Sequence, residues 1–72
     1  MKKLLNTYGF NSDMQYFEMI IESFLNGQFT QAYSQFDAMP RKNKVQMLKS
    51  MTVGGWNSGL GEHKIANLFD RL

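Results

Sequence analysis

The strongest constraint on this chain is that its apolar residues recur at spacings of three and four. The clearest run, which begins five residues after Ser12, consists of Phe17, Ile20, Ile21, Phe24 and Leu25. Such spacing places the side chains on one face of an α-helix. Ser12 and Gln15 fit a capping box, and Asn26-Gly27 supplies a glycine for the left-handed backbone that ends many helices. The sequence therefore predicts a helix over residues 13–26.

Three further segments favour helices. Thr30 can cap a short helix that ends before Met39, because helical geometry is disfavoured for a residue that precedes a proline. Pro40 suits the first position of the next helix, where a missing amide hydrogen costs nothing. The last segment repeats apolar residues at Ile65, Leu68, Phe69 and Leu72. We expect these helices over residues 30–38, 40–51 and 60–71.

Two segments show no clear helical period. The first ten residues contain Leu4, Leu5, Tyr8 and Phe10, and we expect a short irregular N-terminal arm that lays its aromatic rings on the helices. Four glycines among the nine residues 53–61 predict a loop before the last helix. No alternation of apolar and polar residues is long enough for a strand. We expect an all-α fold, a small bundle of four helices in a single domain over residues 1–72.

The composition excludes several classes of protein. The chain has 72 residues, is 43% hydrophobic and carries a net charge of +2, which is too apolar and too weakly charged for a disordered chain. It contains no cysteine, so disulfides, zinc–thiolate sites and thiol catalysis are excluded. No apolar run reaches the ~18–20 residues that span a bilayer, and the one after Lys2-Lys3 is too short for a secretion signal. We expect a cytoplasmic protein with no cofactor and no metal.

Charge is segregated along the chain. Residues 4–40 contain no lysine or arginine, and their acids are Asp13, Glu18, Glu22 and Asp37. Residues 41–49 contain no acid, and their bases are Arg41, Lys42, Lys44 and Lys49. Two interpretations stay open. Either the acidic and basic helices attract each other or simply face solvent, or the basic helix contacts phosphate groups or an acidic partner.

Methionine and tryptophan supply candidates for a protein-binding surface. Met47 and Met51 widen the apolar stripe of the predicted helix 40–51, and Trp56 lies in the glycine-rich loop. Methionine adapts to irregular partner surfaces, and tryptophan is over-represented among binding hot spots. The alternative, that these side chains fill the core, stays open as well.

Residues suited to catalysis are sparse. His63 is the single histidine, and no second histidine or cysteine completes a metal-binding set. Glu18 and Glu22 are four residues apart and share one face of their predicted helix, but this is the polar face, away from the apolar stripe. The glycine-rich loop lacks the lysine that a phosphate-binding loop requires. We expect no enzymatic activity.

Residues 16–43 carry the pattern of a helical hairpin. A turn glycine is followed by two packing residues and by a pair that ends the second helix: Gly27, Ala32, Phe36 and Met39-Pro40. This pattern resembles one pentatricopeptide repeat, an RNA-binding relative of the tetratricopeptide repeat. The resemblance implies a tight helical hairpin. It implies no reading of RNA bases, since such repeats need about three or more stacked units and the chain has a single copy.

These observations predict a small non-enzymatic module for protein–protein interaction or regulation. Its size is typical of the accessory proteins that phages and mobile elements encode. The expected working surface combines Met47, Met51 and Trp56 and is flanked by the bases of the helix 40–51. We expect a protein partner or self-association. The alternative is a weak nucleic-acid-binding domain that uses the basic helix.

Overall fold

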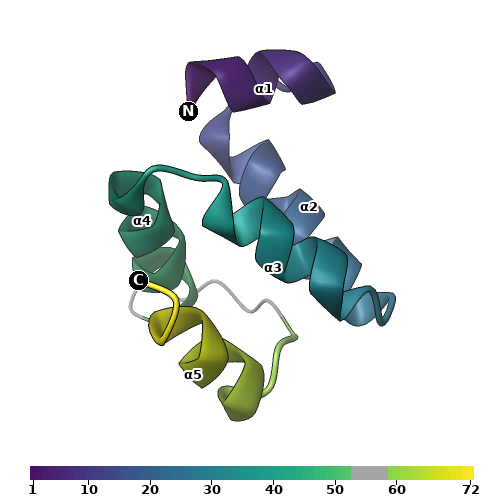
Figure 1. The fold of residues 1–72 in the computed structure, drawn as a ribbon, viewed down its shortest axis with the longest axis vertical. Helices are drawn as coiled ribbons and strands as arrows, with labels where there is room; N and C mark the ends of the chain where they lie inside the picture. Colours follow the sequence, from purple (N-terminus) through teal and green to yellow (C-terminus); the bar gives the residue numbers. More distant parts are fainter. Residues whose placement is uncertain (53–58) are drawn as a thin grey trace.

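The computed structural model describes residues 1–52 and 59–72, which form five α-helices and no strand (Figure 1). In chain order the helices are α1 (Lys2–Tyr8), α2 (Asp13–Leu25), α3 (Phe29–Asp37), α4 (Arg41–Thr52) and α5 (Glu62–Phe69). The predicted all-α class is confirmed, whereas the predicted number of four helices is wrong. Most of the glycine-rich loop, including Trp56, lies outside the described residues.

The N-terminal segment is a helix and not the irregular arm that we expected. Its apolar residues do follow helical spacing: Met1, Leu4, Leu5 and Tyr8. α1 ends at Gly9, whose φ of 73° is left-handed. The Gly9 amide donates to the Asn6 carbonyl at 3.2 Å, and the Phe10 amide donates to the Leu5 carbonyl at 2.8 Å. This pair of hydrogen bonds defines a Schellman motif, so a glycine ends α1 as another glycine ends α2.

Both ends of α2 are built as the sequence predicts. The Ser12 hydroxyl accepts from the Gln15 amide at 3.4 Å, and the Gln15 side chain accepts from the Ser12 amide at 3.2 Å. The predicted capping box is therefore confirmed. At the other end Gly27 has a φ of 78°, and the amides of Gly27 and Gln28 donate to carbonyls of the last turn at 3.0 and 2.9 Å. This second Schellman motif leads the chain directly into α3.

α2 and α3 form a hairpin in which the two helices lie side by side (Figure 1). Side chains of both helices, at most 6% exposed, belong to the hydrophobic core: Tyr16, Phe17, Ile20, Ile21, Phe24, Ala32 and Phe36. The Tyr16 hydroxyl reaches from α2 to donate to the Gln35 carbonyl at 2.7 Å. Carbonyls in the last turn of a helix lack amide partners, so Tyr16 satisfies one for α3. The predicted cap at Thr30 is wrong, because the N-cap position of α3 is Gln28 and no side chain caps it.

α4 and α5 complete the core. α4 contributes Met47, Leu48 and Met51, and α5 contributes Leu68. The C-terminal residues then attach to α3, since Arg71 donates through Nε to Asp37 at 2.9 Å and its guanidinium carbon lies 4.6 Å from the centre of the Tyr33 ring. α5 is shorter at both ends than the predicted segment 60–71, because Gly61 occupies its N-cap position and Asp70 its C-cap position. α1 and α5 lie toward opposite ends of the molecule (Figure 1).

Candidate basic docking face

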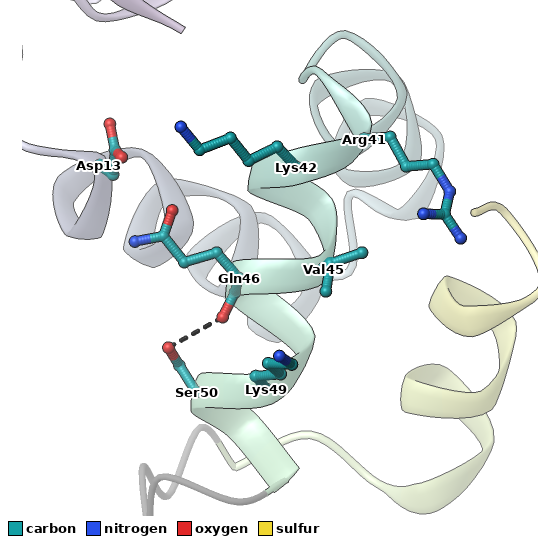
Figure 2. A pocket seen from close by; sticks show the side chains of 7 residues that line it. All are labelled: Asp13, Arg41, Lys42, Val45, Gln46, Lys49 and Ser50. Atoms are coloured by element: carbon teal, nitrogen blue, oxygen red, sulfur yellow. Dashed lines mark hydrogen bonds between the residues drawn. The ribbon is translucent and has the colours of Figure 1, made fainter.

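An open hollow of about 800 Å³ lies along one side of α4 (Figure 2). Six of its lining residues belong to α4: Arg41, Lys42, Val45, Gln46, Lys49 and Ser50. We call these six residues the basic face. Asp13, the first residue of α2, lines the same hollow. The hollow therefore combines three cations with an apolar side chain, two uncharged polar side chains and a carboxylate.

Helical geometry explains why these residues share one side. A helix has about 3.6 residues per turn, so positions three and four apart are neighbours on its surface. Arg41, Val45 and Lys49 form one such row on α4, and Lys42, Gln46 and Ser50 form the adjacent row. The opposite side of α4 is buried and carries Asn43, Met47, Leu48 and Met51. The Ser50 hydroxyl donates to the Gln46 carbonyl at 3.0 Å (Figure 2). The basic face is thus the solvent side of a helix whose other side is in the core.

The cations of the basic face have no carboxylate partner within the described residues. The ion pair found in this part of the chain joins Arg71 to Asp37, at the end of α3. Arg41 and Lys42 also stand in the first turn of α4, which contains no acid. The helix dipole disfavours cations at this end and favours a nearby anion by about 0.3–1 kcal/mol. Arg41 and Lys42 therefore place positive charge at the end of α4 where the helix dipole also favours a bound anion.

Asp13 adds one negative charge to the hollow, but among the described residues it forms no ion pair with the cations of the basic face. Its carboxylate accepts from a buried amide instead. Asn43 is 6% exposed, and its side-chain nitrogen donates to Asp13 at 3.3 Å and to the Gln46 side chain at 3.2 Å. These bonds connect the start of α2 to α4 and fix one wall of the hollow. They leave the cations on the solvent side.

Lys44 lies apart from the other three bases of α4. Its ammonium group is 5.8 Å from the centre of the Phe36 ring, which belongs to the core. A hydrogen bond from Arg71 lowers the pKa of Asp37, and the charges of Arg71 and Lys44 lower it further, against a smaller opposing effect of burial. Lys44 therefore contributes to the junction of α3 and α4, and it does not line the hollow.

Met47 and Met51 do not form the exposed surface that we expected. Met47 is 0% exposed and Met51 is 9% exposed, and both pack in the core cluster. A chain of this length buries a limited fraction of its surface, so large, adaptable side chains such as methionine are needed to fill its core. Trp56, the third residue of that expected surface, lies outside the described residues.

The residues considered for catalysis are exposed, and His63 stands on a different helix from Glu18 and Glu22. His63 is in the first turn of α5, and Glu18 and Glu22 lie on the solvent side of α2. Among the described residues, no three His, Asp or Glu side chains form a group that could hold a metal ion.

Burial, together with the nearby Tyr8, raises the pKa of Tyr16 to about 12. Its phenol therefore stays protonated at neutral pH and donates the bond to α3.

The sequence indicated part of this site. Three of its four predicted bases share the basic face, but Val45, Gln46, Ser50 and Asp13 were missed. The spacing of the α4 residues could have identified them from the sequence. Val45 and Gln46 each lie three or four positions from Lys42 and Lys49, and Ser50 lies four positions after Gln46. Asp13 is brought to the hollow by the tertiary fold, through its bond from Asn43.

The described helices include none with the length and apolar character needed to cross a membrane. Comparisons with protein-family models, with curated proteins and with solved structures find no match. The resemblance of residues 16–43 to a helical repeat therefore stays a prediction.

Proposed function

We propose that the protein is a non-enzymatic binding module whose basic face docks an acidic segment of a partner protein. The observation that carries this proposal is the gathering of Arg41, Lys42 and Lys49 in one open hollow, with no ion pair to any of them in the described part of the chain. Electrostatic complementarity of this kind gives a binding surface its specificity and speeds association.

The uncharged members of the basic face favour a peptide as the ligand. Val45 is half-buried and lies between the cations on the helix surface, where it offers an apolar contact. Beyond their bonds within the protein, the Gln46 side-chain nitrogen can still donate to a peptide backbone and the Ser50 hydroxyl oxygen can still accept from one. A segment that alternates carboxylates with apolar side chains matches this combination better than a bare phosphate backbone does.

A nucleic acid is the second candidate, because clustered lysine and arginine also bind phosphates. With three phosphate contacts the logarithm of the binding constant for a single strand would fall with the logarithm of salt concentration with a slope of about −2. Three contacts are few for a nucleic-acid-binding domain. The peptide is therefore the ligand that the combined charges and apolar contact support best.

Fluorescence anisotropy with two labelled probes tests this function. One probe is a peptide of alternating glutamate and leucine, and the other is a single-stranded oligonucleotide. The variant Lys42→Gln/Lys49→Gln removes two charges of the basic face, and the matched control Lys2→Gln/Lys3→Gln removes two exposed charges of α1. We expect the first variant to bind the peptide about three- to tenfold more weakly, as surface charge pairs contribute modestly, and the control to bind it as the wild type does.

Three results would count against the proposal. Equal weakening in both variants would show that only the total charge matters. Tighter binding of the oligonucleotide, with the salt dependence given above, would favour the second candidate. Absence of binding by either probe would contradict both candidates.

A further inference from the structure

The solvent side of α2 carries a stripe whose chemistry is the counterpart of the basic face. The stripe consists of Met14, Glu18, Glu22 and Leu25, which are all exposed and lie at positions that share one side of the helix. Met14 is 41% exposed and Leu25 is 61% exposed. We call these four residues the acidic stripe. It pairs two carboxylates with two apolar side chains, as the basic face pairs three cations with Val45.

Within the described residues of one molecule, the charges of the acidic stripe and of the basic face do not form ion pairs with each other. Asp37 pairs with Arg71, and Asp13 accepts from the Asn43 amide. Within residues 1–52 and 59–72, neither Glu18 nor Glu22 forms an ion pair, and neither do the cations of the basic face. The segregation of charge along the sequence therefore leaves two unpaired and complementary surfaces on one molecule.

We propose that the acidic stripe of one molecule docks on the basic face of a second copy of the chain. This inference rests on the proposed function, since it names the acidic segment that the basic face receives. Glu18 and Glu22 are one turn apart, about 6 Å along the helix axis at ~1.5 Å per residue. Lys42 and Lys49 are two turns apart, about 10 Å on the same scale. The flexible lysine side chains allow both carboxylates to be reached, while Leu25 or Met14 contacts Val45.

Charge and size together determine how strong this association is. A standard protein interface covers about 800 Å² on each partner, which is a large share of the 4597 Å² surface described for this small chain. A contact between two helix faces is smaller, and its charge pairs stay exposed to solvent. We therefore expect a weak association that salt opposes, because the screening length falls from about 10 Å at ~0.1 M salt to about 3 Å at ~1 M.

Sedimentation equilibrium over a range of concentrations tests the inference. At about 0.05 M NaCl we expect the weight-average mass to rise above the 8.4 kDa of the monomer as concentration increases. At about 0.5 M NaCl the dissociation constant should be at least about tenfold higher, because screening weakens every exposed pair. A wild-type chain that stays monomeric at the highest concentration and the lowest salt would overturn the inference.

Charge reversal identifies the two surfaces. Glu18→Lys/Glu22→Lys and Lys42→Glu/Lys49→Glu should each be monomeric, because each variant carries like charges on both surfaces. An equimolar mixture of the two should associate again, because each surface then has an opposite partner. Glu62→Lys/Asp70→Lys, which reverses two exposed acids at the two ends of α5, is the matched control and should associate as the wild type does. Failure of the mixture to associate would contradict this pairing of surfaces.

The same variants separate this inference from the proposed function. Glu18→Lys/Glu22→Lys retains the whole basic face, so it should bind the glutamate–leucine peptide at least as tightly as the wild type. If the wild type is monomeric but binds the peptide, the inference that a second copy is the partner fails. The proposal that the basic face docks an acidic segment is then retained. If the wild type neither associates nor binds the peptide, both proposals fail. Far-UV circular dichroism of each variant shows whether its helices are retained.

Discussion

The hydroxyl of Tyr16 offers a sharp test of the hairpin, because it donates a buried hydrogen bond from α2 to α3. Tyr16 is 0% exposed, and its hydroxyl donates to the Gln35 carbonyl at 2.7 Å. The side chain of Gln35 is satisfied in the same place, since it accepts from the Ser23 hydroxyl at 3.0 Å. Tyr16→Phe removes one donor from this buried network and leaves the aromatic ring in place.

The expected cost follows from what the substitution leaves behind. A buried hydrogen bond contributes about 0.5–1.5 kcal/mol, and an acceptor left without a partner costs about 1–3 kcal/mol. We expect Tyr16→Phe to lower the free energy of unfolding by about 1–2 kcal/mol, out of the roughly 3–5 kcal/mol that a chain of this size has. The midpoint of thermal unfolding should fall by about 5–15 °C.

Urea unfolding followed by far-UV circular dichroism measures this loss. Tyr8→Phe is the matched control, because Tyr8 is 45% exposed and packs its ring edge-on against Tyr16. The control should lose less than about 0.5 kcal/mol. If Tyr16→Phe is as stable as the control, the Tyr16 hydroxyl does not hold α2 to α3 and this reasoning is refuted.

Three further predictions concern the turn, the core and the pH dependence. Gly27→Ala should cost about 1–2 kcal/mol in urea unfolding, because Gly27 has a φ of 78° and a Cβ there meets nothing within 4 Å, so backbone strain is the whole effect. Met47→Ala should cost about 2–5 kcal/mol through the cavity it leaves, and an unchanged stability would show that Met47 is not in the core. The raised pKa of Tyr16, about 12, favours the folded state fully below pH 10, where the phenol is protonated in both states. This contribution should be lost as the pH rises from about 10 to 12, and Tyr16→Phe should weaken this alkaline loss of stability.

Local chemistry in the sequence was enough to predict where α2 begins and ends. Ser12, Gln15 and Gly27 determine where α2 begins and ends through bonds between near neighbours, so no tertiary information was needed. The same chemistry was present at Gly9, which ends α1 as Gly27 ends α2. The N-terminal helix was missed because it has 7 residues, and a helix that short is stable only when packing supports it.

The candidate site depended more on the tertiary fold. The apolar residues of α4 form a wide stripe from Met47 to Val45, and the sequence does not reveal which edge faces the core. The fold buries Met47 and leaves Val45 half-exposed among the cations. It also separates Lys44 from the basic face by placing it against Phe36. These distinctions arise from contacts between helices that are distant in sequence.

Chemical-shift mapping of the isotope-labelled protein tests the central claim most directly. The glutamate–leucine peptide would be titrated into the labelled chain at about 0.05 M NaCl, where charge screening is weak. We predict that the backbone amide signals of residues 41–50 move most, together with that of Asp13, which lines the same hollow. Shifts centred on α1 or α5, or no shifts at all, would contradict the assignment of the basic face as the docking site.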